Sequence, residues 1–179
     1  MNTLDIGCGK VRTATVTLDI KPGPNVDVVH DITRVPWPFP DDTFDEVRAF
    51  DVLEHLPRDG AEEADSLFRV MIEVRRILRP GGVFIIKSPH QDNPLAWGVP
   101  AHTRVFNEHT FTWFAGSQEA RVTRFDYPTF ARMDLRVTRL YQVGPVSQFH
   151  VRKYAPRLAT VLDRIGFGTK DELHVRLTK

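Results

Sequence analysis

The chain has 179 residues, of which 41% are hydrophobic and 26% are charged. These fractions exclude a disordered chain and fit a single domain over residues 1–179. No apolar run is long enough to span a bilayer, no secretory leader is visible, and the single cysteine excludes an internal disulfide and a cysteine-based zinc cluster. We therefore expect a cytoplasmic protein without membrane contact.

Charge is unevenly distributed along the chain, although the formal net charge is only +1. Residues 1–100 carry 11 Lys/Arg and 16 Asp/Glu, whereas residues 101–179 carry 13 and 7. The basic second half can attract an anionic substrate, or it can neutralise the acidic first half. The usual behaviour of surface charge favours neutralisation.

The chain begins with a strand, a glycine turn and a second strand. The first strand is expected over Thr3–Ile6, the turn contains Gly7 and Gly9, and the second strand covers Val16–Asp19 and ends in an acid. Only nine residues separate the strands, fewer than a helical crossover between parallel strands needs. The connecting helix is therefore expected to be reduced or absent. The pattern indicates a nucleotide-type cofactor at the carboxyl ends of a parallel sheet.

The middle of the chain predicts two further strands, a helix and a central strand. Strands are expected over Val26–His30 and Phe44–Val52. The proline-rich segment Val35–Asp42 between them must be a loop, because proline lacks a backbone donor. A helix over Ala61–Leu78 has apolar residues at spacings of three and four, and Val83–Ile86 is the continuous apolar run of a central parallel strand.

The remaining residues combine an irregular segment with a strand–helix–strand tail. Residues 91–130 contain prolines and polar side chains around a short helix near Glu108–Phe114, and they form a candidate lid over a substrate. Alternating apolar side chains predict strands around Met133–Val137 and Leu173–Leu177. A helix is expected between them, over Ala155–Ile165.

The order of these elements and five short motifs resemble the class I S-adenosylmethionine-dependent methyltransferases. In chain order the motifs are Leu4–Gly9, Val29–Ile32, Pro38–Asp45, Val52–Leu56 and Leu78–Gly82. The resemblance implies an α/β fold: a Rossmann-like, doubly wound, mostly parallel seven-stranded sheet with an antiparallel C-terminal strand. Members of this family that are often associated with glycan pathways are similar in having a shortened first crossover.

The resemblance also implies S-adenosyl-L-methionine as the cofactor, bound over the tips of the first strands. Asp5 is expected to hold the amino group of the cofactor, Asp19 its ribose hydroxyls and Asp31 its adenine amino group. The expected cofactor-binding residues are Asp5, Gly7, Cys8, Gly9, Asp19, Ile20, Asp31, Ile32, Phe50 and Asp51.

The implied activity is transfer of a methyl group to an oxygen or nitrogen of a small, anionic or glycan-related molecule. Such a reaction mainly requires alignment of the acceptor and removal of its proton. His90 and His102 are the candidate bases, and Arg104 is the candidate for holding an anionic group. Either histidine is also explained as a loop residue that bonds to the backbone.

No metal is expected, although one alternative exists. The segment Asp51–His55 is also similar to the Glu-x-x-Glu-His motif of metal-dependent RNA 2′-O-methyltransferases. A divalent ion could be held there with His90 or His102 as a further ligand. Helix capping explains the same residues, and related Glu-His pairs occur without metal.

Two other functions remain open. A binding module can keep this fold without catalysis. An NAD(P)-dependent oxidoreductase is less consistent with the sequence, because the G-x-G-x-x-G pattern fails at Arg12 and Ala14. A nucleic-acid substrate is left open but has no support in the sequence; exocyclic-amine DNA methylation is disfavoured, because Phe50–Leu53 lacks its Asn/Asp-Pro-Pro-aromatic block.

Overall fold

The computed structural model describes residues 1–60, 65–116, 129–140, 157 and 169–179. Seven strands form one sheet in the order β3-β2-β1-β4-β5-β7-β6. Five of them, β1 to β5, run parallel, and β7 is antiparallel to its neighbours β5 and β6. The strands are β1 Thr3–Ile6, β2 Val16–Asp19, β3 Val28–Val29, β4 Phe44–Phe50, β5 Leu78–Pro89, β6 Arg132–Leu140 and β7 Thr169–Thr178. The predicted fold class is confirmed.

The strand β1 lies between β2 and β4 and runs parallel to both. All four of its residues are buried, and Leu4 pairs with Val16 of β2 on one side and with Val47 of β4 on the other. Its apolar residues Leu4 and Ile6 alternate with the buried polar residues Thr3 and Asp5, whose side chains bond to Thr15 and Thr13 near the end of the first crossover. The strand order reverses between β1 and β4, so the switch point of the sheet lies at their carboxyl ends.

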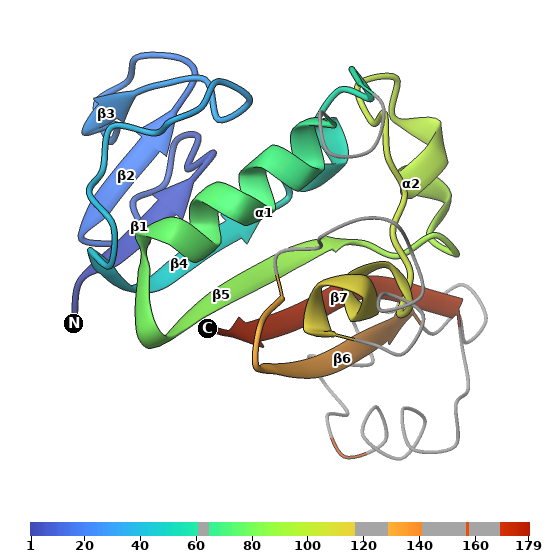
Figure 1. Ribbon diagram of the computed structural model, residues 1–179. Helices are drawn as coiled ribbons and strands as arrows, with labels where there is room; N and C mark the ends of the chain where they lie inside the picture. The colour runs from blue at the N-terminus through green and yellow to red at the C-terminus, as the bar shows by residue number, and fades with distance from the viewer. Residues whose placement is uncertain (61–64, 117–128, 141–156, 158–168) are drawn as a thin grey trace.

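The helix α1, Ser66–Ile77, lies along one face of the sheet (Figure 1). It begins at Asp65, whose carboxylate accepts a hydrogen bond from the backbone of Leu67 at 3.0 Å. Its apolar stripe is buried against the strands, as the spacing of the apolar residues predicts. The predicted start of this helix, residues 61–64, lies outside the described residues.

The first crossover contains no helix among its residues, 7–15, all of which the structure describes. The turn is closed instead by backbone hydrogen bonds from Gly7 and Cys8 to the carbonyl oxygen of Leu18, at 2.8 and 3.3 Å. Further along, the hydroxyl and amide groups of Thr3 and Thr15 bond to each other. Threonine side chains thus satisfy the backbone that a helix would otherwise satisfy.

Several element boundaries differ from the expected ones. β3 is shorter than Val26–His30, and β4 ends at Phe50 because the next residue has a positive φ of 54°. β5 is longer than Val83–Ile86, because Leu78 already pairs with Phe44 across an irregular stretch of the ladder. Three short helices complete the described part: η1 Leu53–His55, α2 Pro94–Gly98 and η3 Thr110–Ala115.

Two expected features fall largely outside the description. Apart from Arg157, the expected helix over Ala155–Ile165 lies outside the described residues, and so do residues 117–128 of the candidate lid. None of the helices in the described part of the chain is of a length and hydropathy that would let it cross a bilayer.

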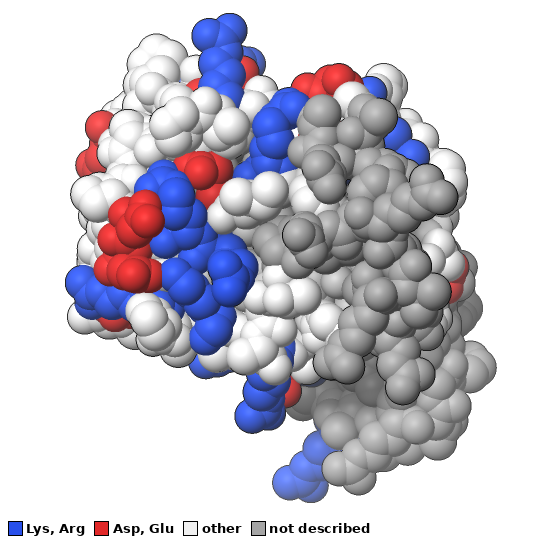
Figure 2. Space-filling model, in the orientation of Figure 1, with Lys and Arg blue, Asp and Glu red and all other residues white. Residues whose placement is uncertain are grey.

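Basic and acidic side chains lie side by side on the face of the molecule that carries α1 (Figure 2). Near the end of α1, Arg76 pairs with Asp41 at 2.7 Å and Arg79 pairs with Asp45 at 2.8 Å. Lys179, at the end of the chain, pairs with Asp42 at 2.6 Å. This last ion pair joins the basic and acidic halves, which supports neutralisation as one role of the uneven charge.

Candidate functional site

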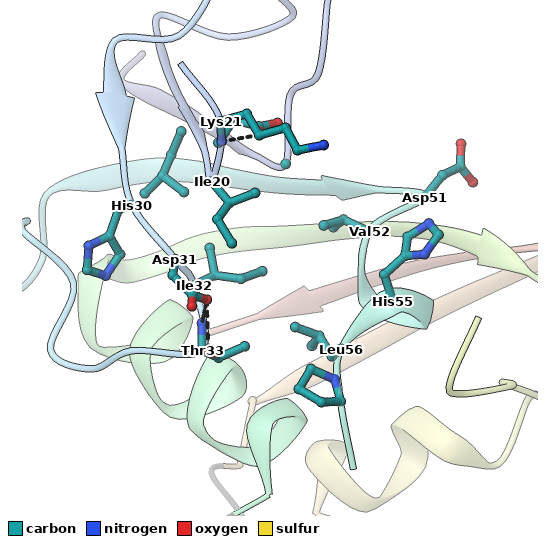
Figure 3. Close-up of a pocket in the computed structure, with 14 residues that line it drawn as sticks. Ile20, Lys21, His30, Asp31, Ile32, Thr33, Asp51, Val52, His55 and Leu56 are labelled. Carbon is teal, nitrogen blue, oxygen red and sulfur yellow. Dashed lines mark hydrogen bonds between the residues drawn. The ribbon is translucent and has the colours of Figure 1, made fainter. Parts of the chain in front are cut away.

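A cavity of about 620 Å³ lies at the carboxyl ends of the parallel strands, a volume typical of small-molecule sites. Figure 3 shows His30 and Asp31 toward one end of it and Asp51 and His55 toward the other. The lining residues follow β1, β2, β3 and β4 in the sequence. They are Gly7, Leu18, Asp19, Ile20, Lys21, His30, Asp31, Ile32, Thr33, Asp51, Val52, His55, Leu56 and Pro57.

Two of the three predicted acids, Asp19 and Asp31, face this cavity. The carboxylate of Asp19 accepts hydrogen bonds from the backbone of Gly9 and of Lys21, both at 2.9 Å. The carboxylate of Asp31 accepts from the Thr33 amide at 2.9 Å and from its hydroxyl at 2.7 Å. Each acid therefore orders the turn that follows its strand and keeps unused acceptor capacity for a ligand.

The charge of Asp31 is stabilised by its surroundings. Partial burial raises the pKa of this carboxyl, but the hydrogen bonds from Thr33 and the nearby charge of Arg34 outweigh burial and hold the pKa below its usual value. Asp31 is therefore ionised at neutral pH and can accept hydrogen bonds from a ligand N–H or O–H group.

The third predicted acid, Asp5, does not line the cavity. Asp5 is only 3% exposed, and its carboxylate accepts a hydrogen bond from the Thr13 hydroxyl. Burial raises the pKa of this carboxyl, despite the Thr13 hydrogen bond and the charge of Arg48. The first crossover folds back over Asp5. Through its hydrogen bond with Thr13, the Asp5 carboxylate holds the crossover in place.

Three other expected cofactor residues also lie outside the lining. The Cys8 thiol approaches the Asn25 carbonyl oxygen, 3.8 Å away, and its pKa is raised by burial and by Asp19. Gly9 acts on the site indirectly, through its hydrogen bond to Asp19. Phe50 is half-buried at the end of β4.

The turn after β4 shapes the other end of the cavity. Asp51 has a positive φ of 54°, and its carboxylate pairs with Lys87 of β5 at 2.8 Å. The turn places Val52 against Gly7: a Cβ atom at Gly7 would lie 2.4 Å from the Val52 Cγ2 atom. Only glycine fits at this position, because the Val52 side chain packs directly against the Gly7 backbone and brings the tips of β1 and β4 close together.

An asparagine at position 5 separates a structural role from a cofactor role. We expect Asp5→Asn to raise the free energy of unfolding, because it removes a charge whose burial is unfavourable and keeps an acceptor for Thr13. A raised pKa in the folded state means that the gain is absent below the unfolded pKa of about 3.9 and grows as the pH rises through the folded pKa.

Urea unfolding at several pH values measures this effect, and calorimetry with S-adenosylhomocysteine measures cofactor affinity in the same variant. We expect the affinity to be unchanged. A stable Asp5→Asn protein that lost affinity would instead show that the carboxylate acts on the cofactor.

His90, a predicted base, is completely buried. Its Nδ1 atom accepts a hydrogen bond from the Asp92 amide at 3.0 Å, so Nε2 carries the proton and donates it to the Glu108 carboxylate at 3.0 Å. These contacts engage both ring nitrogens. In this arrangement neither nitrogen is free to take a proton from a substrate.

Arg104, predicted to hold an anionic group, is also buried, with 7% exposure. Its guanidinium pairs with Asp65 at 2.7 Å and donates to the carbonyl oxygens of Leu56 and Pro57. It therefore joins the segment after β4 to the start of α1. The Arg104 guanidinium is therefore not free to bind an anion at the cavity.

His102, the other predicted base, lies close to the cavity because it contacts His55, a lining residue that the sequence did not predict. Its ring packs edge-on against the ring of His55, with centroids 4.8 Å apart. His55 lines the cavity, and Glu54 lies beside both rings. Burial raises the pKa of Glu54, although it accepts a hydrogen bond from Ser88 at 3.0 Å.

Several lining residues were not predicted, and most share one sequence signal. Lys21, His30, Thr33 and Val52 each stand within two residues of a predicted acid or strand end. Residues at the carboxyl ends of parallel strands converge on one edge of the sheet, so proximity to a strand end was the available signal. Leu18, next to the predicted Asp19, shares this signal, and His55, Leu56 and Pro57 complete the unpredicted part of the lining.

The fold and the cavity together define a Rossmann-like α/β domain with its site at the switch point. Residues 14–86 match the family model described as a methyltransferase domain. A probable S-adenosylmethionine-dependent methyltransferase of Mycolicibacterium smegmatis is 38% identical over 96 residues, which are 50% of this chain and 33% of that protein. The chain thus matches about a third of the length of this relative.

Solved structures agree with the fold. A methyltransferase from Archaeoglobus fulgidus has a TM-score of 0.63 at 18% identity and covers 99% of this chain and 86% of its own. Phosphoethanolamine N-methyltransferase 2 of Haemonchus contortus, solved with S-adenosyl-L-methionine, has a TM-score of 0.54 at 14% identity and covers 100% and 48%. The family model and the relative each match part of the chain, and the solved structures share its fold; the chain is thus similar to S-adenosylmethionine-dependent methyltransferases, as its motifs predicted.

Proposed function

We propose that the protein binds S-adenosyl-L-methionine in the cavity at the strand tips and transfers its methyl group to an oxygen or nitrogen of a small molecule. One observation carries this proposal: Asp19 and Asp31, which follow β2 and β3, line one cavity together with Gly7 at the switch point. This arrangement fits a nucleoside, since carboxylates accept hydrogen bonds from hydroxyl and amino groups. Gly7 has no side chain, so its backbone lines the cavity directly and is open to a ligand there.

The place of each residue in the lining decides which part of the cofactor it is proposed to hold. Asp19 suits a pair of ribose hydroxyls, because its two oxygens can accept at the same time. Asp31 suits the adenine amino group, and Ile20 and Ile32 supply apolar contact for the rings. Asp51, at the far end, suits the amino acid part of the cofactor. Asp5 serves the site by holding the first crossover.

The acceptor is proposed to enter at the end of the cavity that His55 lines. The segment before Arg104 reaches this end, since the His55 ring bonds to the Ala101 carbonyl oxygen at 3.1 Å. The bound cofactor supplies a methyl group on a positively charged sulfur. The chain's own residues align the acceptor and take up its proton, and the imidazoles of His55 and His102 are the groups placed for that task.

Arg104 and His90 are engaged by other residues, so the proposal does not depend on them. The acceptor is proposed to be a small molecule, and the described part of residues 91–130 is proposed to cover it. The exposed side chains of Leu95 and Trp97 on α2, 63% and 69% exposed, suit a segment that closes over a substrate.

Binding measurements with S-adenosylhomocysteine and with NAD test the proposal. We expect calorimetry to detect S-adenosylhomocysteine and not NAD. Asp19→Asn should weaken binding by about tenfold, because a hydrogen bond to a charged group is lost. Asp134→Asn, on the exposed part of β6, is the matched control and should bind as the unmodified chain does. Binding of NAD alone would favour an oxidoreductase.

Mass spectrometry of candidate acceptors incubated with S-adenosyl-L-methionine then tests transfer. A product heavier by one methyl group supports the enzyme. Cofactor binding without any methylated product across hydroxyl and amine acceptors would favour the non-catalytic binding module.

A further inference from the structure

Glu54, His55 and His102 form a cluster between two segments that are far apart in the sequence. Glu54 and His55 belong to η1, directly after β4, and His102 belongs to the segment that follows α2. One potential ligand atom of each residue lies within 4.8 Å of the other two. No other group of three such residues in the described ranges meets this condition.

Backbone hydrogen bonds hold the two segments together. The amides of Thr103 and Arg104 both donate to the Glu54 carbonyl oxygen, at 2.9 and 3.1 Å. The Thr103 hydroxyl and the Arg104 guanidinium donate to the Leu56 carbonyl oxygen, at 2.6 and 2.8 Å. The residues next to His102 are therefore fixed to both neighbours of His55. This frame places the two imidazoles opposite each other before any ligand arrives.

The hydrogen bonds of the two rings define which nitrogen is available. The Nδ1 atom of His55 bonds to the Ala101 carbonyl oxygen at 3.1 Å, and the Nδ1 atom of His102 bonds to the Ala96 carbonyl oxygen at 3.3 Å. A carbonyl oxygen can only accept, so both Nδ1 atoms carry a proton. In the neutral rings the Nε2 atoms then present lone pairs, and nothing in the described part of the chain donates to them.

This is the arrangement that metal-binding histidines adopt. A ligating imidazole usually donates its second N–H to a backbone carbonyl or carboxylate, which fixes the ring orientation. Glu54 completes the set: it is 2% exposed, and no Lys or Arg of the described residues lies within ion-pair distance of it. A cation at the cluster would give this buried carboxylate a charge partner.

We propose that Glu54, His55 and His102 bind a divalent transition-metal ion of the zinc type at the acceptor end of the cavity. Two imidazoles and one carboxylate are a known catalytic zinc ligand set, and imidazole nitrogen disfavours magnesium and calcium. Zinc bonds of about 2.1 Å place tetrahedral donors about 3.4 Å apart, so the three donors, which lie within 4.8 Å of one another, must close by at most about 1.4 Å. The exposed ring of His55 can make most of this movement.

With three ligands from the chain, a zinc site of the catalytic kind keeps one coordination position open. We infer that this position takes an oxygen of the methyl acceptor at the end of the cavity that His55 lines; the bound oxygen loses its proton more readily, and that proton passes to water. This role, unlike metal binding itself, rests on the proposed methyl transfer. It also replaces the role of base proposed above for His55 and His102: as ligands they orient and activate the acceptor through the ion, whereas a base takes the proton directly. Asp51 is not part of the set, since it pairs with Lys87.

The experiment uses the full chain after chelation and removal of the chelator. Titration with Zn²⁺ is followed by calorimetry, and titration with Co²⁺ by its visible absorption. We expect one ion per chain. His55→Gln and His102→Gln should each weaken Zn²⁺ binding by at least about tenfold, since loss of even an outer partner has that effect. His109→Gln, which alters an exposed histidine outside the cluster, should bind Zn²⁺ as the unmodified chain does.

Thermal melts without metal identify variants that fail to fold, and Glu54→Gln provides a third ligand variant that keeps an acceptor for Ser88. Absence of Zn²⁺ and Co²⁺ binding, binding that both histidine variants retain, or a response to Mg²⁺ alone would overturn the proposal. Calorimetry with S-adenosylhomocysteine in the same samples separates the two proposals. A chain that binds Zn²⁺ at the cluster without binding S-adenosylhomocysteine keeps the metal site and loses the methyltransferase role.

Discussion

Replacement of Glu73 by alanine is expected to lower the free energy of unfolding by about 3 kcal/mol, the range found when one partner of a buried ion pair is removed. Glu73 lies on α1 with 5% exposure. Its carboxylate accepts from the Trp37 amide at 2.7 Å and from the Arg76 guanidinium at 2.7 and 3.0 Å. Alanine leaves the buried Trp37 amide without its acceptor and removes the buried carboxylate that pairs with Arg76, which then keeps only the more exposed Asp41 as a charge partner. Urea unfolding measures the loss.

The same network attaches the proline-rich loop to the helix, which is why a large effect is expected. Arg76 also donates to the carbonyl oxygens of Trp37 and Phe39, and Trp37 is 2% exposed. A matched control is Asp134→Ala, which removes an ion pair to Arg132 whose side chains are 48% and 72% exposed. Such a pair contributes well under 1 kcal/mol. Equal losses in both variants would contradict the network.

The pH dependence of Glu73 provides a second measurement. Burial raises the pKa of this carboxyl, but the hydrogen bonds from Arg76 and Trp37 and the charge of Arg76 outweigh burial and hold the pKa below its usual value. For an acid with a lowered pKa, the stabilisation is complete above the unfolded pKa of about 4.3 and is lost as the pH falls through the folded pKa. The deficit of Glu73→Gln should therefore be full at neutral pH and shrink in acid.

The sequence predicted the strands well because their signals are local. The apolar run Val83–Ile86 and the alternation of Leu173, Val175 and Leu177 are properties of a few adjacent residues, and burial on one or both faces follows directly from them. The short first crossover was also a local signal, since nine residues cannot contain the usual helix. These features needed no knowledge of distant contacts.

The roles of individual polar side chains were harder to predict because their partners are distant. His90 and Arg104 stand in loops where a free base or a free cation was a reasonable expectation. Their partners Glu108 and Asp65 lie 18 and 39 residues away, and only the folded chain brings them together. Asp5 is similar, because the partner Thr13 reaches it only when the crossover folds back.

The residues of the candidate metal cluster were likewise only partly predictable from the sequence. The adjacent pair Glu54 and His55 was visible in the sequence, but the choice of His90 or His102 as a further ligand was open. Both histidines follow β5, and nothing in their local sequences separates them. The backbone hydrogen bonds to Glu54 and Leu56 decide it, because they bring the segment of His102 alongside η1.

Gly7→Ala is expected to lower both stability and cofactor affinity. A Cβ atom at position 7 would lie 2.4 and 2.9 Å from the Cγ2 and Cβ atoms of Val52, closer than atoms pack, and Gly7 has a φ of +71°. Overpacking and left-handed strain together cost about 2–4 kcal/mol. Val52 lines the cavity, so displacement of its side chain should also weaken S-adenosylhomocysteine binding. We expect a loss of more than about tenfold, because a tenfold loss corresponds to only about 1.4 kcal/mol. Urea unfolding and calorimetry measure the two effects.

Gly9→Ala separates strain from steric overlap, because Gly9 also has a positive φ, +57°, but a Cβ atom there meets nothing within 4 Å. We expect it to cost about 1 kcal/mol and to leave affinity nearly unchanged. Val52→Ala combined with Gly7→Ala should recover part of both losses, since it removes the nearest atom, Cγ2, and leaves the Val52 Cβ contact in place. If Gly7→Ala and Gly9→Ala behaved alike, or if the second substitution recovered nothing, the close approach of the two strand tips would not be what limits the site.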